Sequence, residues 1–218
     1  MSFDITYIAI VLVVILFSMM LHEIMHGVMA YALGDDTAKL KGRLSLNPFR
    51  HIDPFLTILL PILLAIAGGP IFGGAKPVPF NPNRVKGGEW GAAAVGIIGP
   101  LTNLVLAFVS FGLIALLYPS PDSLFGQILA VGVYVNLGFF AFNMLPIPPL
   151  DGSRLLYAVA PGSVRRAMEA IERNGLMFIF AFVLILSFVP GEPLGRFLVT
   201  IINAIINLFA GIFGVQIV

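Results

Sequence analysis

The sequence contains no cysteine and has few charged residues of either sign. The absence of cysteine excludes disulfides, cysteine-based zinc sites and thiol nucleophiles. Charged residues make up 11% of the 218 residues and hydrophobic residues 59%, whereas a soluble domain carries roughly 25% charged residues. The 12 Lys and Arg residues nearly balance the 11 Asp and Glu residues, so no basic excess points to nucleic acid. The composition therefore predicts a compact, multi-spanning membrane protein rather than a soluble domain.

Long stretches with few or no charges predict the membrane spans. A helix needs about 20 apolar residues to cross the roughly 30 Å hydrocarbon core. Residues 5–33, 91–118, 124–150 and 197–218 are long enough, and residues 176–190 are marginal. We therefore predict an all-α polytopic membrane protein in which residues 1–218 form a single integral membrane domain.

Residues 54–88 are rich in proline and glycine, which disfavours a stable spanning helix. If residues 54–75 crossed the membrane, 5 Lys and Arg residues would lie on one side and 7 on the other. If they dip in and return, the distribution becomes 11 against 1. Because positive residues collect in cytoplasmic loops, the sequence predicts a re-entrant segment at 54–88. The N-terminus then lies outside, and the basic loops 34–90 and 151–175 lie in the cytoplasm.

A short polar cluster interrupts the first apolar stretch. His22-Glu23-Ile24-Met25-His26 reads H-E-x-x-H, and residues four apart share one helical face, so both imidazoles can bind one Zn²⁺. Glu23 is offset from them, where a carboxylate can take a proton from water at the metal. Three ionisable residues inside a membrane span are costly and indicate a function. The cluster therefore predicts a catalytic zinc site.

A catalytic zinc site usually has three protein ligands, and His51 and Asp151 are the candidates for the third. Asp151 follows a proline-rich run that breaks the last part of a long uncharged span, and broken backbone at membrane depth is tolerated beside a cavity. In the re-entrant topology Asp151 shares the cytoplasmic depth of the two histidines. We therefore favour Asp151 as the ligand and expect His51 to lie at the membrane interface.

Two amides inside apolar spans, Asn103 and Asn143, admit two interpretations. They can join helices by hydrogen bonds, because an amide in hydrocarbon finds a partner across helices. They can instead stabilise the substrate backbone or the developing oxyanion. The sequence alone leaves both interpretations open.

The segment Lys76-Pro77-Val78-Pro79-Phe80 suits an extended edge strand, because proline is confined to edges of sheets. Such a short membrane-associated β-strand could hold an unwound substrate by β-augmentation. The alternative is an ordinary interfacial loop.

The ordered set of motifs resembles the site-2 protease family of intramembrane zinc metalloproteases. The resemblance covers most of residues 15–160 and rests on the runs Leu21–Gly27, Gly99–Asn103 and Asn143–Gly152. It implies a three-helix catalytic core followed by C-terminal helices, and one zinc ion per chain held by the residues His22, His26 and Asp151. It also implies that Glu23 is the general base, and it favours the substrate or oxyanion role for Asn103 and Asn143. The Ala-Lys-Pro-Val-Pro run at 75–79 is similar to that of small bacterial and archaeal members without PDZ or CBS domains.

The expected function is therefore hydrolysis of peptide bonds in or near transmembrane segments of substrate proteins. The expected location is the cell membrane (inner or plasma membrane), with the active site towards the cytoplasmic side. The expected partners are a membrane-protein or peptide substrate and the lipid bilayer. A metal-ion transporter is the main alternative, since ionisable residues in a membrane also mark ion pathways, and a metal-binding scaffold is another. Glu23 discriminates against the transporter, which does not need a carboxylate offset from the ligands. Nothing in the sequence supports the scaffold, because every expected catalytic position is filled.

Overall fold

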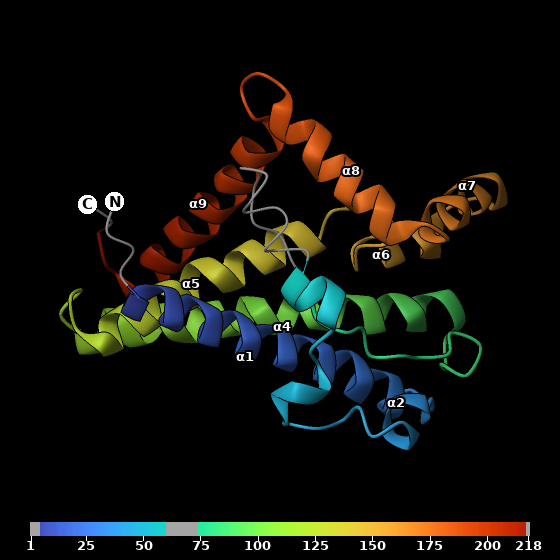
Figure 1. Ribbon diagram of the computed structural model, residues 1–218, viewed down its shortest axis with the longest axis horizontal. Coiled ribbons are helices and arrows are strands. Elements are labelled where there is room, and N and C mark those ends of the chain that lie inside the picture. Colours follow the sequence, from blue (N-terminus) through green and yellow to red (C-terminus); the bar gives the residue numbers. More distant parts are fainter. Residues whose placement is uncertain (1–4, 60–73, 217–218) are drawn as a thin grey trace.

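The computed structural model describes residues 5–59 and 74–216, and its regular elements are helices (Figure 1). In chain order these elements are α1 (Ile5–Ala32), α2 (Thr37–Leu40), η1 (Pro48–Arg50), η2 (Pro54–Leu59), α4 (Gly88–Leu117), α5 (Leu124–Asn143), α6 (Ser153–Val159), α7 (Gly162–Glu172), α8 (Gly175–Phe188) and α9 (Pro193–Phe213). The predicted all-α membrane fold is confirmed.

Three long helices form the centre of the molecule. α1, α4 and α5 contact one another pairwise and run along its length, and α9 packs against α4 and α5 (Figure 1). Ala107 of α4, Leu137 of α5 and Phe209 of α9 form one buried cluster. Large apolar side chains such as Val13 and Val105 remain exposed, as expected for helices whose outer faces contact lipid rather than water.

Four of the helices, α1, α4, α5 and α9, are long and apolar enough to cross a membrane. α5 ends at Asn143, seven residues before the predicted end of its span at residue 150, because the proline-rich run that follows cannot continue a helix. α8 has 14 residues, which amounts to about 21 Å at 1.5 Å per residue. It is thus too short to cross the hydrocarbon core by itself.

The C-terminal helices fold back over the three-helix centre. Figure 1 shows α8 running away from α7, and α9 returning to the end of the molecule where α1 begins. Phe213, the last residue of α9, packs against Phe108 and Phe111 of α4, with ring centroids 5.3 and 6.0 Å apart. The end of α9 therefore lies beside the C-terminal half of α4.

The two ends of the proline- and glycine-rich segment meet. The hydroxyl of Thr57, in η2, donates to the carbonyl of Gly74 (2.7 Å), and the N–H of Lys76 donates to the carbonyl of His51 (2.8 Å). The chain thus returns at residue 74 to the place it left at residue 59. The middle of the predicted re-entrant segment, residues 60–73, lies outside the described residues.

The short β-strands that the sequence permits are absent from residues 5–59 and 74–216. Lys76–Phe80 is irregular backbone instead. Pro77 and Pro79 have no N–H to donate to a neighbouring strand, and the N–H groups of Lys76 and Val78 bond to a loop carbonyl and to a side chain. The segment is therefore held to the helices by individual hydrogen bonds rather than by a sheet.

Candidate metal centre

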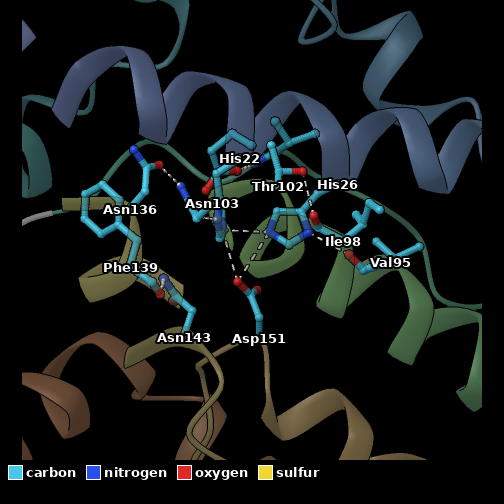
Figure 2. A network of polar contacts seen from close by, with 12 residues as sticks. His22, His26, Val95, Ile98, Thr102, Asn103, Asn136, Phe139, Asn143 and Asp151 are labelled. Carbon is cyan, nitrogen blue, oxygen red and sulfur yellow. Dashed lines mark hydrogen bonds and ion pairs between the residues drawn. The ribbon is translucent and has the colours of Figure 1, made fainter. Parts of the chain in front are cut away.

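His22 and His26 lie on one face of α1, and Asp151 reaches them from the chain between α5 and α6 (Figure 2). The Nε2 atoms of the two histidines are 3.0 Å apart. One carboxylate oxygen of Asp151, Oδ2, lies 3.0 Å from Nε2 of His22 and 3.4 Å from Nε2 of His26. The structure thus brings together the three residues that the sequence nominates as ligands.

Hydrogen bonds to α4 orient both imidazole rings. Nδ1 of His22 lies 2.6 Å from Oδ1 of Asn103, and Nδ1 of His26 lies 2.6 Å from the carbonyl oxygen of Val95. Since both partners are acceptors, each Nδ1 carries the proton and donates it. In its neutral form, each ring then presents an unprotonated Nε2 to the other ring and to Asp151.

This donor set fits a zinc ion. Two imidazole lone pairs and a carboxylate oxygen face one another within 4.8 Å, and three acceptors so close together repel unless a cation lies among them. Two histidines and one carboxylate form a known zinc ligand set, with a fourth position left for water or substrate. The cluster can therefore bind one metal ion.

Two glycines of α4 make room for the site. A Cβ atom on Gly99 would lie 2.4 Å from Nε2 of His26 and 2.7 Å from Cε1 of His22. A Cβ atom on Gly96, one helical turn earlier, would lie 2.8 Å from the Arg154 side chain and 3.0 Å from the carbonyl of Asp151. The absence of a side chain at both positions therefore lets α4 approach the histidines and the chain around Asp151 closely.

The chain after α5 turns back on itself to present Asp151. The N–H of Gly152 donates to the carbonyl of Asn143 (2.7 Å), and a Cβ atom on Gly152 would lie 2.4 Å from the carbonyl of Met144. Leu145 and Leu150 are buried against Ile179 of α8. Glycine at 152 and the apolar contact with α8 thus keep the carboxylate near α1.

Glu23 faces a cavity of about 460 Å³ beside the histidines. The cavity lies between α1, α5 and the chain around Thr57 and Gly74, and most of its wall is apolar. Its lining residues are Leu12, Ile15, Met19, His22, Glu23, Thr57, Gly74, Ala75, Tyr134, Val135, Gly138, Phe139, Phe142, Asn143 and Leu150. A peptide in this cavity would lie next to both the ligand cluster and Glu23.

The two amides nominated from the sequence occupy different places. Asn143 lines the cavity, and its Nδ2 donates to the carbonyl of Phe139 (3.0 Å). Asn103 is fully buried and uses both ends of its amide, accepting from His22 and donating to Oδ1 of Asn136 (2.8 Å). Only Asn143 can therefore reach a bound peptide without rearrangement.

Asn136 was not predicted from the sequence. It is buried in α5, and its Nδ2 donates to the carbonyl of Gly132 (2.8 Å), which fixes its Oδ1 towards Asn103 (Figure 2). A chain of amides thus runs from α5 through α4 to His22. The available signal was a third asparagine inside an apolar span.

His51 does not join the cluster of His22, His26 and Asp151. It is buried in the loop after η1, and its Nε2 lies 2.8 Å from the carbonyl of Ser45. Its main-chain carbonyl receives the N–H of Lys76. His51 thus contacts the segment that runs beside Glu23 rather than the ligand atoms.

Comparisons with known proteins point to zinc metalloproteases. The family model of Peptidase family M50 matches residues 119–187. The protein named "Putative zinc metalloprotease YwhC" from Bacillus subtilis is 38% identical over 95% of this chain and 92% of its own length. "Putative zinc metalloprotease Rip2" from Mycolicibacterium smegmatis is 29% identical over 82% of this chain and 69% of its own length. No solved structure matches the chain.

Proposed function

Since the chain belongs to Peptidase family M50 and is a zinc-dependent intramembrane metalloprotease, we propose that it is a site-2-type endopeptidase whose zinc ligands are His22, His26 and Asp151. One observation carries the ligand assignment. The two Nε2 atoms and Oδ2 of Asp151 converge while both Nδ1 atoms are tied to acceptors on α4. This arrangement supports binding of one cation by all three donor atoms.

His22, His26 and Asp151 would hold a zinc ion, which would supply Lewis-acid chemistry by polarising the scissile carbonyl and lowering the pKa of an attacking water towards about 7. Glu23, adjacent in sequence to the ligand His22 and facing the same cavity, takes the proton of that water and passes it to the leaving amine. Asn143 lines the cavity and supplies an amide donor to the substrate backbone or the developing oxyanion. Asn103 acts through His22 by holding its ring.

The substrates are membrane-spanning or membrane-proximal segments of other proteins. The cavity wall is mostly apolar and is formed by α1 and α5, two helices that can themselves cross the membrane. A helical substrate buries its carbonyls in its own hydrogen bonds, so it must unwind locally before cleavage. The cavity accommodates such an unwound stretch beside Glu23.

The experiment that tests this function compares purified wild type with Glu23→Gln on single-span candidate substrates. The amide keeps the shape of the side chain but cannot accept the proton, so we expect the variant to retain one zinc per chain and lose cleavage. Metal analysis of Asp151→Ala and His51→Ala completes the test. Cleavage by Glu23→Gln at the wild-type rate rejects Glu23 as the base, and zinc loss in His51→Ala but not in Asp151→Ala rejects the ligand set.

The orientation is proposed from the distribution of Lys and Arg, because 11 of the 12 lie in loops 34–90 and 151–175, which supports a cytoplasmic location of these loops. The chain has no native cysteine, so single cysteines report their side directly. Cysteines at Ser45, Asn83 and Ser163 should be labelled from the cytoplasmic side and one at Ser120 from outside. Opposite labelling of Ser45 and Asn83 would show that residues 54–75 cross the membrane.

A further inference from the structure

Glu23 is held by the main chain of a loop. In the structure, the N–H of Val78 donates to Oε2 of Glu23 at 2.7 Å. Val78 lies in the irregular segment Lys76–Phe80, far from Glu23 in sequence. The bond occupies one carboxylate oxygen and leaves the other, Oε1, to receive a proton.

Both ends of the Lys76–Phe80 segment are anchored. At its start, the N–H of Lys76 donates to the carbonyl of His51 (2.8 Å), and its carbonyl accepts from the guanidinium of Arg43 (2.6 Å). Just beyond its end, the N–H of Asn81 donates to Oδ2 of Asp35 (2.5 Å). His51, Arg43 and Asp35 are buried. The segment therefore has a defined position relative to α1.

The side chain of Val78 fixes the middle of the segment against α1. Val78 is buried, and a Cβ atom on Gly27 would lie 3.0 Å from Cγ1 of Val78. Gly27 follows Glu23 by four residues and so lies on the same face of α1, one turn along. The absence of a side chain at position 27 lets the loop approach closely enough for its N–H to reach the carboxylate.

The two flanking prolines single out the N–H of Val78. Pro77 and Pro79 have no N–H, and their rings restrict the backbone on both sides. Since Val78 donates to Glu23 and Lys76 donates to His51, neither N–H is available to a substrate strand in this arrangement. The segment is better suited to hold the side chain of Glu23 than to pair with a peptide through these donors.

We propose that Val78, through its main-chain N–H, is a positioning residue that holds the Glu23 carboxylate in the orientation required for proton transfer. A glutamate has three side-chain torsions, and a misplaced catalytic group can cost about 100-fold in rate. The inference rests on the proposed role of Glu23 as the base. It assigns the Lys76–Phe80 segment a part in catalysis that requires no contact with zinc.

The sharpest test replaces the amide at position 78 by an ester, using the α-hydroxy analogue of valine, which removes the N–H and keeps the side chain. We expect kcat to fall about 10- to 100-fold, with KM and zinc content unchanged. The matched control is the same replacement at Val85, which is also buried and whose N–H makes no hydrogen bond in the described residues. A wild-type kcat for the ester at position 78 would overturn the proposal.

A second measurement does not depend on activity. Hydrogen exchange of the Val78 amide, followed by NMR of valine-labelled protein in nanodiscs, should be slow in wild type and in Glu23→Gln, whose side-chain oxygen can still accept. Exchange should be fast in Glu23→Ala, which lacks the acceptor. Equal exchange in all three proteins would overturn the proposal. An active Glu23→Gln would instead reject Glu23 as the base, so the two failures are distinguishable.

Discussion

His22, Glu23 and His26 occupy little more than one turn of α1, yet two very different parts of the molecule hold them. The histidines are oriented by acceptors on α4, a 30-residue helix that packs along α1. Glu23 is oriented by the irregular Lys76–Phe80 segment. The metal-binding half of the site thus has two of its three ligands on packed helices, and the proton-transfer half depends on a loop.

Because of this difference, we expect zinc affinity and turnover to respond to substitutions in different parts of the molecule. Helices fix side chains through many packed neighbours, so the geometry of the two histidines should be insensitive to changes in the Lys76–Phe80 segment. Irregular backbone is fixed by a few individual hydrogen bonds and is the less stable part of most proteins. Changes on α4 should therefore affect zinc affinity, and changes around the loop should affect turnover while zinc stays bound.

The largest effect is expected from Gly99→Ala on the helix side. The new methyl group would lie 2.4 Å from Nε2 of His26, and neither ring can retreat without losing its hydrogen bond to α4. We expect near-complete loss of bound zinc, measured by metal analysis of the purified protein. Gly211→Ala in α9, where a Cβ atom meets nothing within 4 Å, is the control and should retain zinc. One zinc per chain in Gly99→Ala would contradict the described packing.

A smaller loss is expected from Asn103→Leu. The substitution removes the acceptor of His22 Nδ1 and leaves the ring free to rotate, and loss of such a supporting hydrogen bond typically weakens metal affinity about 10- to 100-fold. Competition with a chromophoric chelator measures the affinity. Asn103→Asp keeps an oxygen acceptor and should lose less. An unchanged affinity in Asn103→Leu would show that the helix contact does not orient the ligand.

Asn136→Leu should weaken zinc binding less than Asn103→Leu, because Asn136 acts only by fixing the amide of Asn103. The same chelator competition measures it. If Asn136 acts only through its hydrogen bond to Asn103, the double variant Asn103→Leu/Asn136→Leu should bind zinc no more weakly than Asn103→Leu alone. Additive losses would show that the amides act independently.

The smallest effect on activity is expected from the substitution Asp35→Asn, on the loop side of the site. Burial alone would raise the pKa of this carboxyl, but donors from Thr37 and the N–H of Asn81 lower it more, and the net pKa lies below the ordinary value. A lowered pKa means that the stabilisation is complete above the ordinary value and is lost as the pH falls through the lowered one. Asp35→Asn imitates this loss at neutral pH and should loosen Asn81.

We expect Asp35→Asn to bind zinc with wild-type affinity and to show faster hydrogen exchange at the amides of Asn81 and Val78. Its kcat should fall less than that of the Val78 ester, because the contacts of His51 and Arg43 with Lys76 remain. A fall in zinc affinity together with kcat would break the separation between the two halves of the site.

The metal-binding half of the site was largely predictable from the sequence. H-E-x-x-H places two imidazoles on one helical face, and a carboxylate after a proline-rich break must lie beside protein at membrane depth. The structure places these groups together. The limits of α1, α4 and α9 lie within a few residues of the predicted spans, because long apolar runs determine spanning helices directly.

The rest depended on information that a single sequence does not carry. The donor to Glu23 is a main-chain N–H, which has no residue-type signature. Asn136 resembles any amide in a span until its partner is known, because hydrogen-bond geometry depends on how α4 and α5 rotate against each other. Of the two alternatives for Lys76–Phe80, the edge strand was wrong within the described residues and the segment is irregular, since a proline-flanked segment can be held equally well by side chains.

The packing of Phe213 against Phe108 and Phe111 has a practical consequence for anyone attaching a reporter to this protein. α9 finishes at the end of the bundle where α1 starts, away from the ligand cluster (Figure 1). Fluorescent or affinity tags joined before α1 and after α9 should therefore emerge at the same end of the bundle. A donor–acceptor dye pair at these two places would report on how firmly the C-terminal helix stays against the core while the catalytic cavity is left undisturbed.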